Sequence, residues 1–197
     1  MAKTLLEMAG AQPRPAPLSS AALVVIDAQR EYLDGALPLG GIEPALERLA
    51  LLLGKARAAG TPVIHIAHKG RAGSLFDRDG AGGQIVDQAR PLDGEPVIEK
   101  PLPNSFAKTD LEAQLRATGR PNLILAGFMT HMCVSSTARA ALDLGFPVTI
   151  AADAAATRAL PDGQGGEISA EALHRAELAA LGDRFACIAT VAEITAD

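Results

Sequence analysis

Aromatic residues and clustered positive charge are both scarce in this chain, and their scarcity excludes one class of partner. Aromatic residues make up 3% of the 197 residues, with no tryptophan and a single tyrosine, so the stacking platforms that bind single-stranded nucleic acid are missing. The net charge is −5 and no basic run occurs, which removes the electrostatic footprint of nucleic-acid binding. We therefore expect no nucleic-acid partner.

Disulfide-forming cysteines and long apolar runs are also missing. The two cysteines, Cys133 and Cys187, make no disulfide framework and fit a reducing cytoplasm. The N-terminal apolar stretch is interrupted by Glu7 and is too short for a secretory signal, and no run reaches the length of a membrane span. We expect a cytoplasmic protein without a membrane partner. Residues 1–19 form a proline-containing arm that either packs on a neighbouring subunit or is a loose tail.

The chain does contain a regular alternation of apolar, strand-length runs and amphipathic helical patterns. Runs that are apolar on both faces and alternate with helices predict a parallel sheet covered on both sides. We predict one domain over residues 1–197, a three-layer α/β/α sandwich with a six-stranded, mostly parallel, Rossmann-like sheet. The predicted strands span 21–27, 61–68, 95–100, 121–127, 146–153 and 184–190, and the predicted helices span 41–60, 109–119, 133–145 and 169–182.

Residues 69–94, between the second and third predicted strands, show no periodic pattern. An irregular segment of this length in a compact domain usually has a function, so we interpret it as a lid or substrate loop. It contains the glycine-rich stretch 80–84, which does not follow a predicted strand. That stretch is therefore not a phosphate-binding signature.

Three reactive side chains come at the ends of predicted strands. Asp27 closes the first strand, Lys100 closes the third, and Cys133 lies at the turn from the fourth strand into a helix. Ligands of open parallel sheets bind outside the carboxyl ends of the strands, so these side chains are expected to converge there. The helix start favours a thiolate at Cys133, and Lys100 would keep Asp27 ionised. Each residue also has an ordinary interpretation, as a turn cap, a surface lysine or a small buried hydrophobe.

The sequence around these residues resembles the isochorismatase-like cysteine hydrolases, which include nicotinamidases, N-carbamoylsarcosine amidases and isochorismatases. The resemblance covers roughly residues 20–192 and is carried by ALVVIDAQREYL, VIEKPLPNSF and LILAGFMTHMCVSSTARAALDLGFPVTIAADAAATR. It implies a catalytic triad of Asp27, Lys100 and Cys133. It also implies a cis peptide bond between Phe128 and Met129, backbone oxyanion donors at Met129 and Cys133, and a homo-oligomer.

Within that superfamily, Cys133 favours hydrolysis of an amide-like C–N bond of a small metabolite through a thioester. One alternative is a non-covalent vinyl-ether hydrolase that uses Asp27 as general acid. Another is a non-catalytic protein that binds a metabolite or partner. No aspartate lies two residues before His65 or His68, and these two face opposite sides of a strand. We expect no metal or other cofactor, and a small neutral amide as substrate.

Further candidates for the substrate pocket are Phe106, His68, Tyr32, Phe76, His131 and Thr130. Relatives place a substrate-facing aromatic residue where Phe106 stands, although core packing would also explain it. His131 is interpreted as pocket lining or a subunit contact rather than as the base of a Cys–His dyad. Thr130 is interpreted as a helix cap, with a hydrogen bond to Asp27 as the alternative. Cys187 is expected in the core and His174 in solvent.

Overall fold

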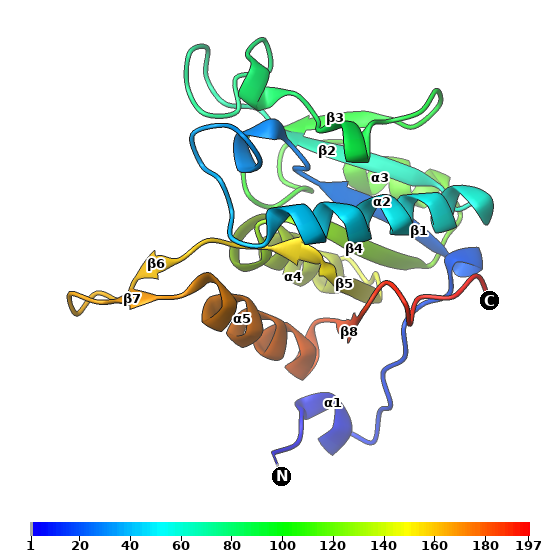
Figure 1. Cartoon of the computed structure of the whole chain (residues 1–197). Helices are drawn as coiled ribbons and strands as arrows, with labels where there is room; N and C mark the ends of the chain where they lie inside the picture. The colour runs from blue at the N-terminus through cyan, green and yellow to red at the C-terminus, as the bar shows by residue number, and fades with distance from the viewer. Residues whose placement is uncertain (1) are drawn as a thin grey trace.

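The computed structural model describes residues 2–197 and contains a six-stranded sheet in the order β3-β2-β1-β4-β5-β8. All neighbouring strands of this sheet pair in parallel, which confirms the predicted fold class. A separate two-stranded antiparallel hairpin, β6 and β7, lies between β5 and the last helix (Figure 1). The strands are β1 Ala21–Ile26, β2 Val63–His68, β3 Val97–Lys100, β4 Asn122–Phe128, β5 Val148–Ala156, β6 Leu160–Pro161, β7 Glu167–Ile168 and β8 Cys187–Ala189.

Two apolar clusters, one on each face of the sheet, join the helices to it. Alternate residues of β1 supply both clusters, with Leu23 and Val25 on one face and Val24 and Ile26 on the other. Helix α2 belongs to the first cluster, and α3, α4 and α5 contribute to the second. Figure 1 shows α2 in front of the sheet and α3 and α4 behind it. The helices are α1 Leu5–Met8, α2 Ile42–Ala58, α3 Leu111–Ala117, α4 Ser135–Asp143 and α5 Ala170–Arg184.

Prolines set the start of four strands and correct the predicted bounds. Strands β2, β3, β4 and β5 each begin at the residue after a proline. Proline has no N–H to donate to a ladder, but its carbonyl still accepts. Three of these carbonyls accept a hydrogen bond from an N–H group of the neighbouring strand. Pro62 accepts from Leu23, Pro96 from His65, and Pro147 from Leu123. Each of these four strands therefore starts one residue after its proline.

The irregular segment 69–94 is docked onto the chain that follows β1. Gln29 and Ile85 form an antiparallel bridge, and the Val86 N–H donates to the Ala28 carbonyl at 2.9 Å. The Gln29 side-chain amide also donates to the Gly83 carbonyl at 2.8 Å. The segment contains only two short 3-10 turns, Ala81–Gly83 and Asp87–Ala89. It is thereby held over the edge where β1 and β2 end.

The described part of the N-terminal arm, residues 2–19, contacts its own chain. The Leu5 N–H donates to Asp183 Oδ1 at 2.8 Å, and the Ala16 N–H donates to Thr149 Oγ1 at 2.9 Å. Helix α1 lies below the sheet in Figure 1 and buries none of its residues. Packing of the arm on a neighbouring subunit stays a prediction.

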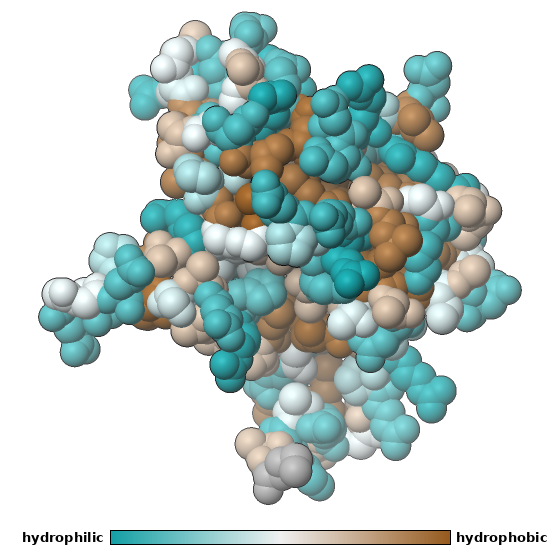
Figure 2. Space-filling model, viewed as in Figure 1, coloured by the Kyte–Doolittle hydropathy of each residue, from teal (hydrophilic) through white to brown (hydrophobic). Residues whose placement is uncertain are grey.

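The face of the molecule seen in Figure 2 is mainly polar. Figure 2, seen from the α2 side, shows polar residues over most of the molecule, with apolar residues visible between them in the middle of the view. Within residues 2–197, no helix has both the length and the apolar character needed to cross a bilayer.

Candidate functional site

Asp27, Lys100 and Cys133 meet at the carboxyl edge of the sheet. The Lys100 ammonium nitrogen lies 2.7 Å from Asp27 Oδ2 and 3.2 Å from Cys133 Sγ. It also donates to the Leu102 carbonyl at 3.2 Å. Asp27 and Lys100 are fully buried, and Cys133 is 4% exposed. The convergence that the strand ends predicted is therefore found, with the lysine bridging carboxylate and sulfur.

The strand register explains why these residues meet. Ile26 pairs with both Ile66 and Gly127, and His68 pairs with Lys100, so the ends of the four strands β3, β2, β1 and β4 lie side by side. A Cβ at Gly127, where φ is +114°, would lie 2.0 Å from the Ile26 carbonyl oxygen. Only glycine allows β1 and β4 to approach this closely. Gly127 therefore sets the distance between Asp27 and the turn that holds Cys133.

The turn after β4 wraps around one carbonyl group. The Phe128–Met129 peptide bond is cis, as the resemblance implied. The Met132 and Val134 N–H groups both donate to the Met129 carbonyl, at 3.0 and 3.2 Å. Residues Thr130–Val134 form a single π-helical turn that runs into α4. Cys133 thus precedes α4 rather than opening a regular α-helix.

Burial dominates the protonation of the site. It raises the pKa of Asp27, against the opposing influence of the Lys100 ammonium. Burial and the Asp27 charge raise the pKa of Cys133 to about 12, although Lys100 lowers it. Burial therefore opposes the thiolate that the helix start was expected to favour, because a thiolate removed from water loses its hydration.

Three of the predicted pocket residues form an aromatic wall beside the triad. Tyr32 meets Phe76 edge to face with ring centroids 5.0 Å apart, and His68 meets Phe76 at 5.3 Å. Burial raises the pKa of Tyr32, and the Asp27 and Cys133 charges raise it further. Burial lowers the pKa of His68, with Lys100 also lowering it. Tyr32 and His68 therefore lie close enough to the triad for its charges to shift their pKa values.

Phe106 does not join this wall. Its ring is stacked on Phe146, with centroids 6.3 Å apart and an angle of 13° between the planes. It packs against the apolar cluster that contains α3 and α4. This packing favours the core-packing alternative, and the substrate-facing role of Phe106 stays a prediction.

Thr130 and His174 also differ from expectation, whereas His131 does not. The buried Thr130 hydroxyl contacts the Ala156 carbonyl at 3.1 Å and His174 Nδ1 at 2.8 Å, so it neither caps the helix nor binds Asp27. His174 is half-buried rather than in solvent. His131 is hydrogen-bonded through Nδ1 to the Thr157 hydroxyl. Cys133 is bonded to Lys100, so the geometry does not favour a Cys–His dyad.

His65 belongs to a buried charge cluster away from the triad. Its Nε2 lies 2.9 Å from Glu95 Oε2, and Glu95 also accepts from Arg57 at 2.8 Å. His65 itself is 1% exposed, and its Nδ1 has no hydrogen-bond partner among residues 2–197. In the part of the chain that the structure describes, residues 2–197, no group of three or more His, Cys, Asp or Glu side chains could hold a metal ion.

Sequence reasoning missed Arg158 and Glu31. Arg158 follows β5 at the same sheet edge, and its charge lowers the pKa of both Tyr32 and His131. Its buried Nε has no hydrogen-bond partner among residues 2–197. Glu31 is 5% exposed and accepts from the Ala36 N–H at 2.7 Å. The position of Arg158 after a predicted strand was the only sequence signal that it lies at this edge. No sequence signal indicates that Glu31 is buried.

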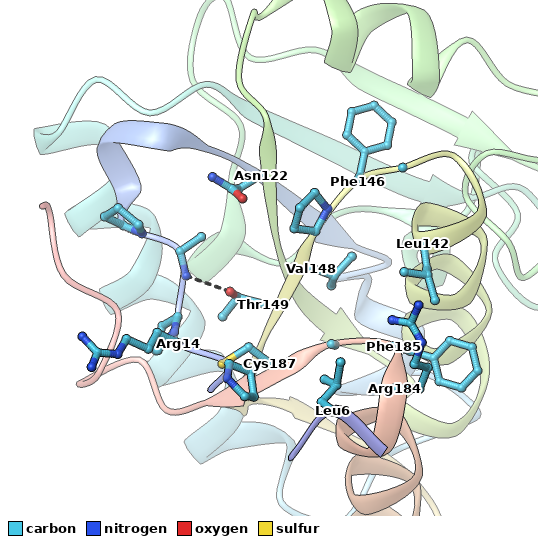
Figure 3. A pocket seen from close by; sticks show the side chains of 17 residues that line it. Leu6, Arg14, Asn122, Leu142, Phe146, Val148, Thr149, Arg184, Phe185 and Cys187 are labelled. Atoms are coloured by element: carbon cyan, nitrogen blue, oxygen red, sulfur yellow. Dashed lines mark hydrogen bonds between the residues drawn. The ribbon is translucent and has the colours of Figure 1, made fainter. Parts of the chain in front are cut away.

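A separate cavity of about 530 Å³ lies at the opposite edge of the sheet. Figure 3 shows it between the arm, Phe146, Val148 and Cys187, with the hydrogen bond to Thr149 on one side. None of its lining residues belongs to the triad or to the aromatic wall. Cavity size therefore does not mark the candidate site, which the buried charges identify instead.

These features define an α/β/α protein with a buried acid, lysine and thiol at the carboxyl edge of a parallel sheet. The family model described as "Isochorismatase domain" matches residues 21–193. The chain therefore belongs to the isochorismatase family of hydrolases.

Individual relatives match between 72% and 98% of the chain. A crystal structure of an isochorismatase from Pseudomonas putida KT2440 superposes with a TM-score of 0.94 at 43% identity, covering 98% of this chain and 100% of that one. The secreted isochorismatase effector Isc1 of Verticillium dahliae is 36% identical over 95% of this chain and 96% of its own length. The ureidoacrylate amidohydrolase RutB of Stutzerimonas stutzeri is 30% identical over 72% of this chain and 73% of its own length.

Proposed function

We propose that this hydrolase cleaves an amide-like C–N bond of a small metabolite through a thioester on Cys133. The observation that carries the proposal is the position of the Lys100 ammonium, between the Asp27 carboxylate and the Cys133 sulfur. A similar protein is named an amidohydrolase, which supports a C–N bond as the target. Asp27, Lys100 and Cys133 form the proposed catalytic triad.

The first half of the reaction makes the thioester. Sulfur of Cys133 attacks the substrate carbonyl carbon while the thiol proton passes to Asp27. The carbonyl oxygen becomes an oxyanion that accepts from the Met129 and Cys133 N–H groups, each such donor being worth about 3 kcal/mol. Asp27 returns its proton to the substrate nitrogen, the C–N bond breaks, and the amine leaves.

The second half regenerates the enzyme. Water gives a proton to Asp27 and attacks the thioester carbon, the C–S bond breaks, and Asp27 reprotonates the sulfur. Lys100 remains an ammonium throughout and balances the negative charge as it moves between oxygen and sulfur. Because the resting pKa of Cys133 is about 12, proton transfer accompanies the attack instead of preceding it.

The substrate proposal changes in one respect from the neutral amide expected from the sequence. The Tyr32, Phe76 and His68 wall suits a small flat group. The Arg158 guanidinium adds a positive charge at the same sheet edge. We propose that it favours substrates with an anionic substituent. A matched pair, N-carbamoylglycine and its methyl ester, measures this preference directly, and Arg158→Gln should reduce it by about tenfold.

One alternative has a specific observation in its favour. Burial raises the pKa of Asp27, so this group could act as the general acid of a non-covalent vinyl-ether hydrolase. The non-catalytic alternative is disfavoured, because Lys100 is fully buried in the triad and does not point to solvent. We also propose a homo-oligomer that acts in the cytoplasm on a small molecule, without nucleic-acid or membrane partners.

The test is an amide and vinyl-ether panel assayed on wild type, Cys133→Ala and Cys187→Ala. The panel contains nicotinamide, carbamoyl amines, simple carboxamides and isochorismate. Cys133→Ala should lose turnover on the best amide, Cys187→Ala should keep it, and a slow substrate should add mass to Cys133. Undiminished amide turnover in Cys133→Ala would remove the covalent route, and isochorismate turnover without an adduct would establish the vinyl-ether alternative.

A further inference from the structure

Helix α5 reaches the back of the turn that carries Cys133. The Thr130 side chain on that turn is fully buried, and its hydroxyl lies 2.8 Å from Nδ1 of His174 on α5. The same hydroxyl lies 3.1 Å from the Ala156 carbonyl at the end of β5. One side chain of the turn is therefore fastened to two other elements at once.

The hydrogen bonds assign a direction to this contact. A threonine hydroxyl has one proton, and the Ala156 carbonyl can only accept it. With that bond made, the Thr130 oxygen accepts from His174 Nδ1, a tautomer assigned from the bonding pattern. Burial lowers the pKa of His174, and a hydrogen bond to the Ala152 backbone raises it. The resulting chain runs from the His174 ring through the Thr130 hydroxyl to the β5 backbone.

We infer that His174 is a positioning residue for the proposed hydrolysis, because it locks Thr130 and with it the turn between Met129 and Cys133. The inference rests on the proposed function, in which that turn supplies both the nucleophile and the oxyanion donors. Thr130 directly follows Met129 and lies three residues before Cys133. Since a displacement of about 1 Å in a reacting group can cost about a hundredfold in rate, a lock here acts on the reaction without touching substrate.

The chain offers matched variants for this contact. His174→Asn keeps an N–H donor near the position of Nδ1, whereas His174→Leu fills similar space without a donor. Thr130→Ser keeps the hydroxyl, and Thr130→Val removes it. His174 and Glu171, both on α5, line a cavity of about 360 Å³. Glu171→Gln is therefore a control on the same helix and in the same cavity. That cavity also gives added imidazole a route to the space left by His174→Ala.

The experiment follows turnover of the best panel amide and alkylation of Cys133 by iodoacetamide, the latter by mass spectrometry. We expect His174→Leu to lower kcat by about ten- to a hundredfold with KM nearly unchanged. His174→Asn and Glu171→Gln should stay near wild type, and imidazole should partly restore His174→Ala. The Thr130→Val, His174→Leu double variant should be no worse than the poorer single variant, because both substitutions remove the same Thr130–His174 hydrogen bond.

Additive losses in the double variant, or equal kcat in His174→Leu and wild type, would overturn the inference. Should His174→Leu fail to fold, Thr130→Val against Thr130→Ser decides alone, and equal kcat in that pair overturns it. Failure of the proposed function looks different, since Cys133→Ala would then retain turnover. Cys133→Ala inactive with His174→Leu fully active would reject only the role of His174.

Discussion

The protein contains two clusters that each join a carboxylate to a cation, one fully buried and one partly buried, and the pKa values of the two carboxylates shift in opposite directions. In the Glu95 cluster, the carboxylate accepts from Arg57, from the Leu92 N–H and from His65. Although burial raises the pKa of Glu95, these bonds lower it to about 2. In the triad, Asp27 faces the Lys100 ammonium and the Cys133 sulfur, and burial raises its pKa.

The difference shows how a structural charge cluster is told apart from a reactive one. Glu95 has enough donors to hold a full negative charge, so it is locked in one state. Asp27 is fully buried with fewer donors, so its charged and neutral forms lie closer in free energy. A group that must take and return a proton needs the second situation.

The largest expected effect comes from Lys100→Met. It leaves the buried Asp27 carboxylate without its cation, which should cost about 3–5 kcal/mol of unfolding free energy and abolish turnover. Urea unfolding measures the first effect and the amide assay the second. Lys69→Met is the control, because Lys69 is exposed and pairs only with Glu99, and it should behave as wild type. Wild-type stability in Lys100→Met would mean that Asp27 is neutral in the resting site.

Glu95→Gln should have the next largest effect, a loss of about 2 kcal/mol at neutral pH, because Arg57 and His65 lose their charged acceptor. The folded pKa of Glu95, about 2, lies below its usual 4.5. Its contribution is therefore present above pH 4.5 and is lost as the pH falls from 4.5 towards 2. The stability difference between wild type and variant, measured by urea unfolding, should shrink over that window. A constant difference would show that Glu95 is not locked in its charged state.

Asp27→Asn should have a smaller effect, which is to lower the pKa of the Cys133 thiol. Removing the Asp27 charge takes away one cause of the raised pKa of Cys133, so that pKa should fall by about one unit. Thiolate absorbance against pH measures this shift. Turnover should nevertheless be lost, because the proton carrier is gone. A pKa that rises in this variant would mean that Asp27 stabilises the thiolate in the native site.

Cys187→Ser should have the smallest effect. Cys187 is only partly buried and lies at the edge remote from the triad. Its replacement should change the unfolding free energy by less than about 1 kcal/mol and leave turnover unchanged. If Cys187→Ser lost as much turnover as Cys133→Ser, the result would contradict the assignment of Cys133 as the nucleophile.

The sequence predicted the framework because its signals are local. Apolar runs and helical periodicity located the six strands and the principal helices, and chain order placed Asp27, Lys100 and Cys133 at strand ends. Prolines 62, 96, 121 and 147 were visible in the same sequence, but their role in starting strands emerged only from the carbonyls that pair across the sheet. The resemblance supplied the cis bond and the family.

The structure alone decided the state and surroundings of those residues. The stacking of Phe106 on Phe146, the contact of Thr130 with His174, and the burial that raises the pKa of Cys133 depend on partners remote in sequence. Local pattern determines which residues lie at an edge of the sheet. Desolvation and long-range contacts, which exist only once the chain is packed, determine their charge and their neighbours.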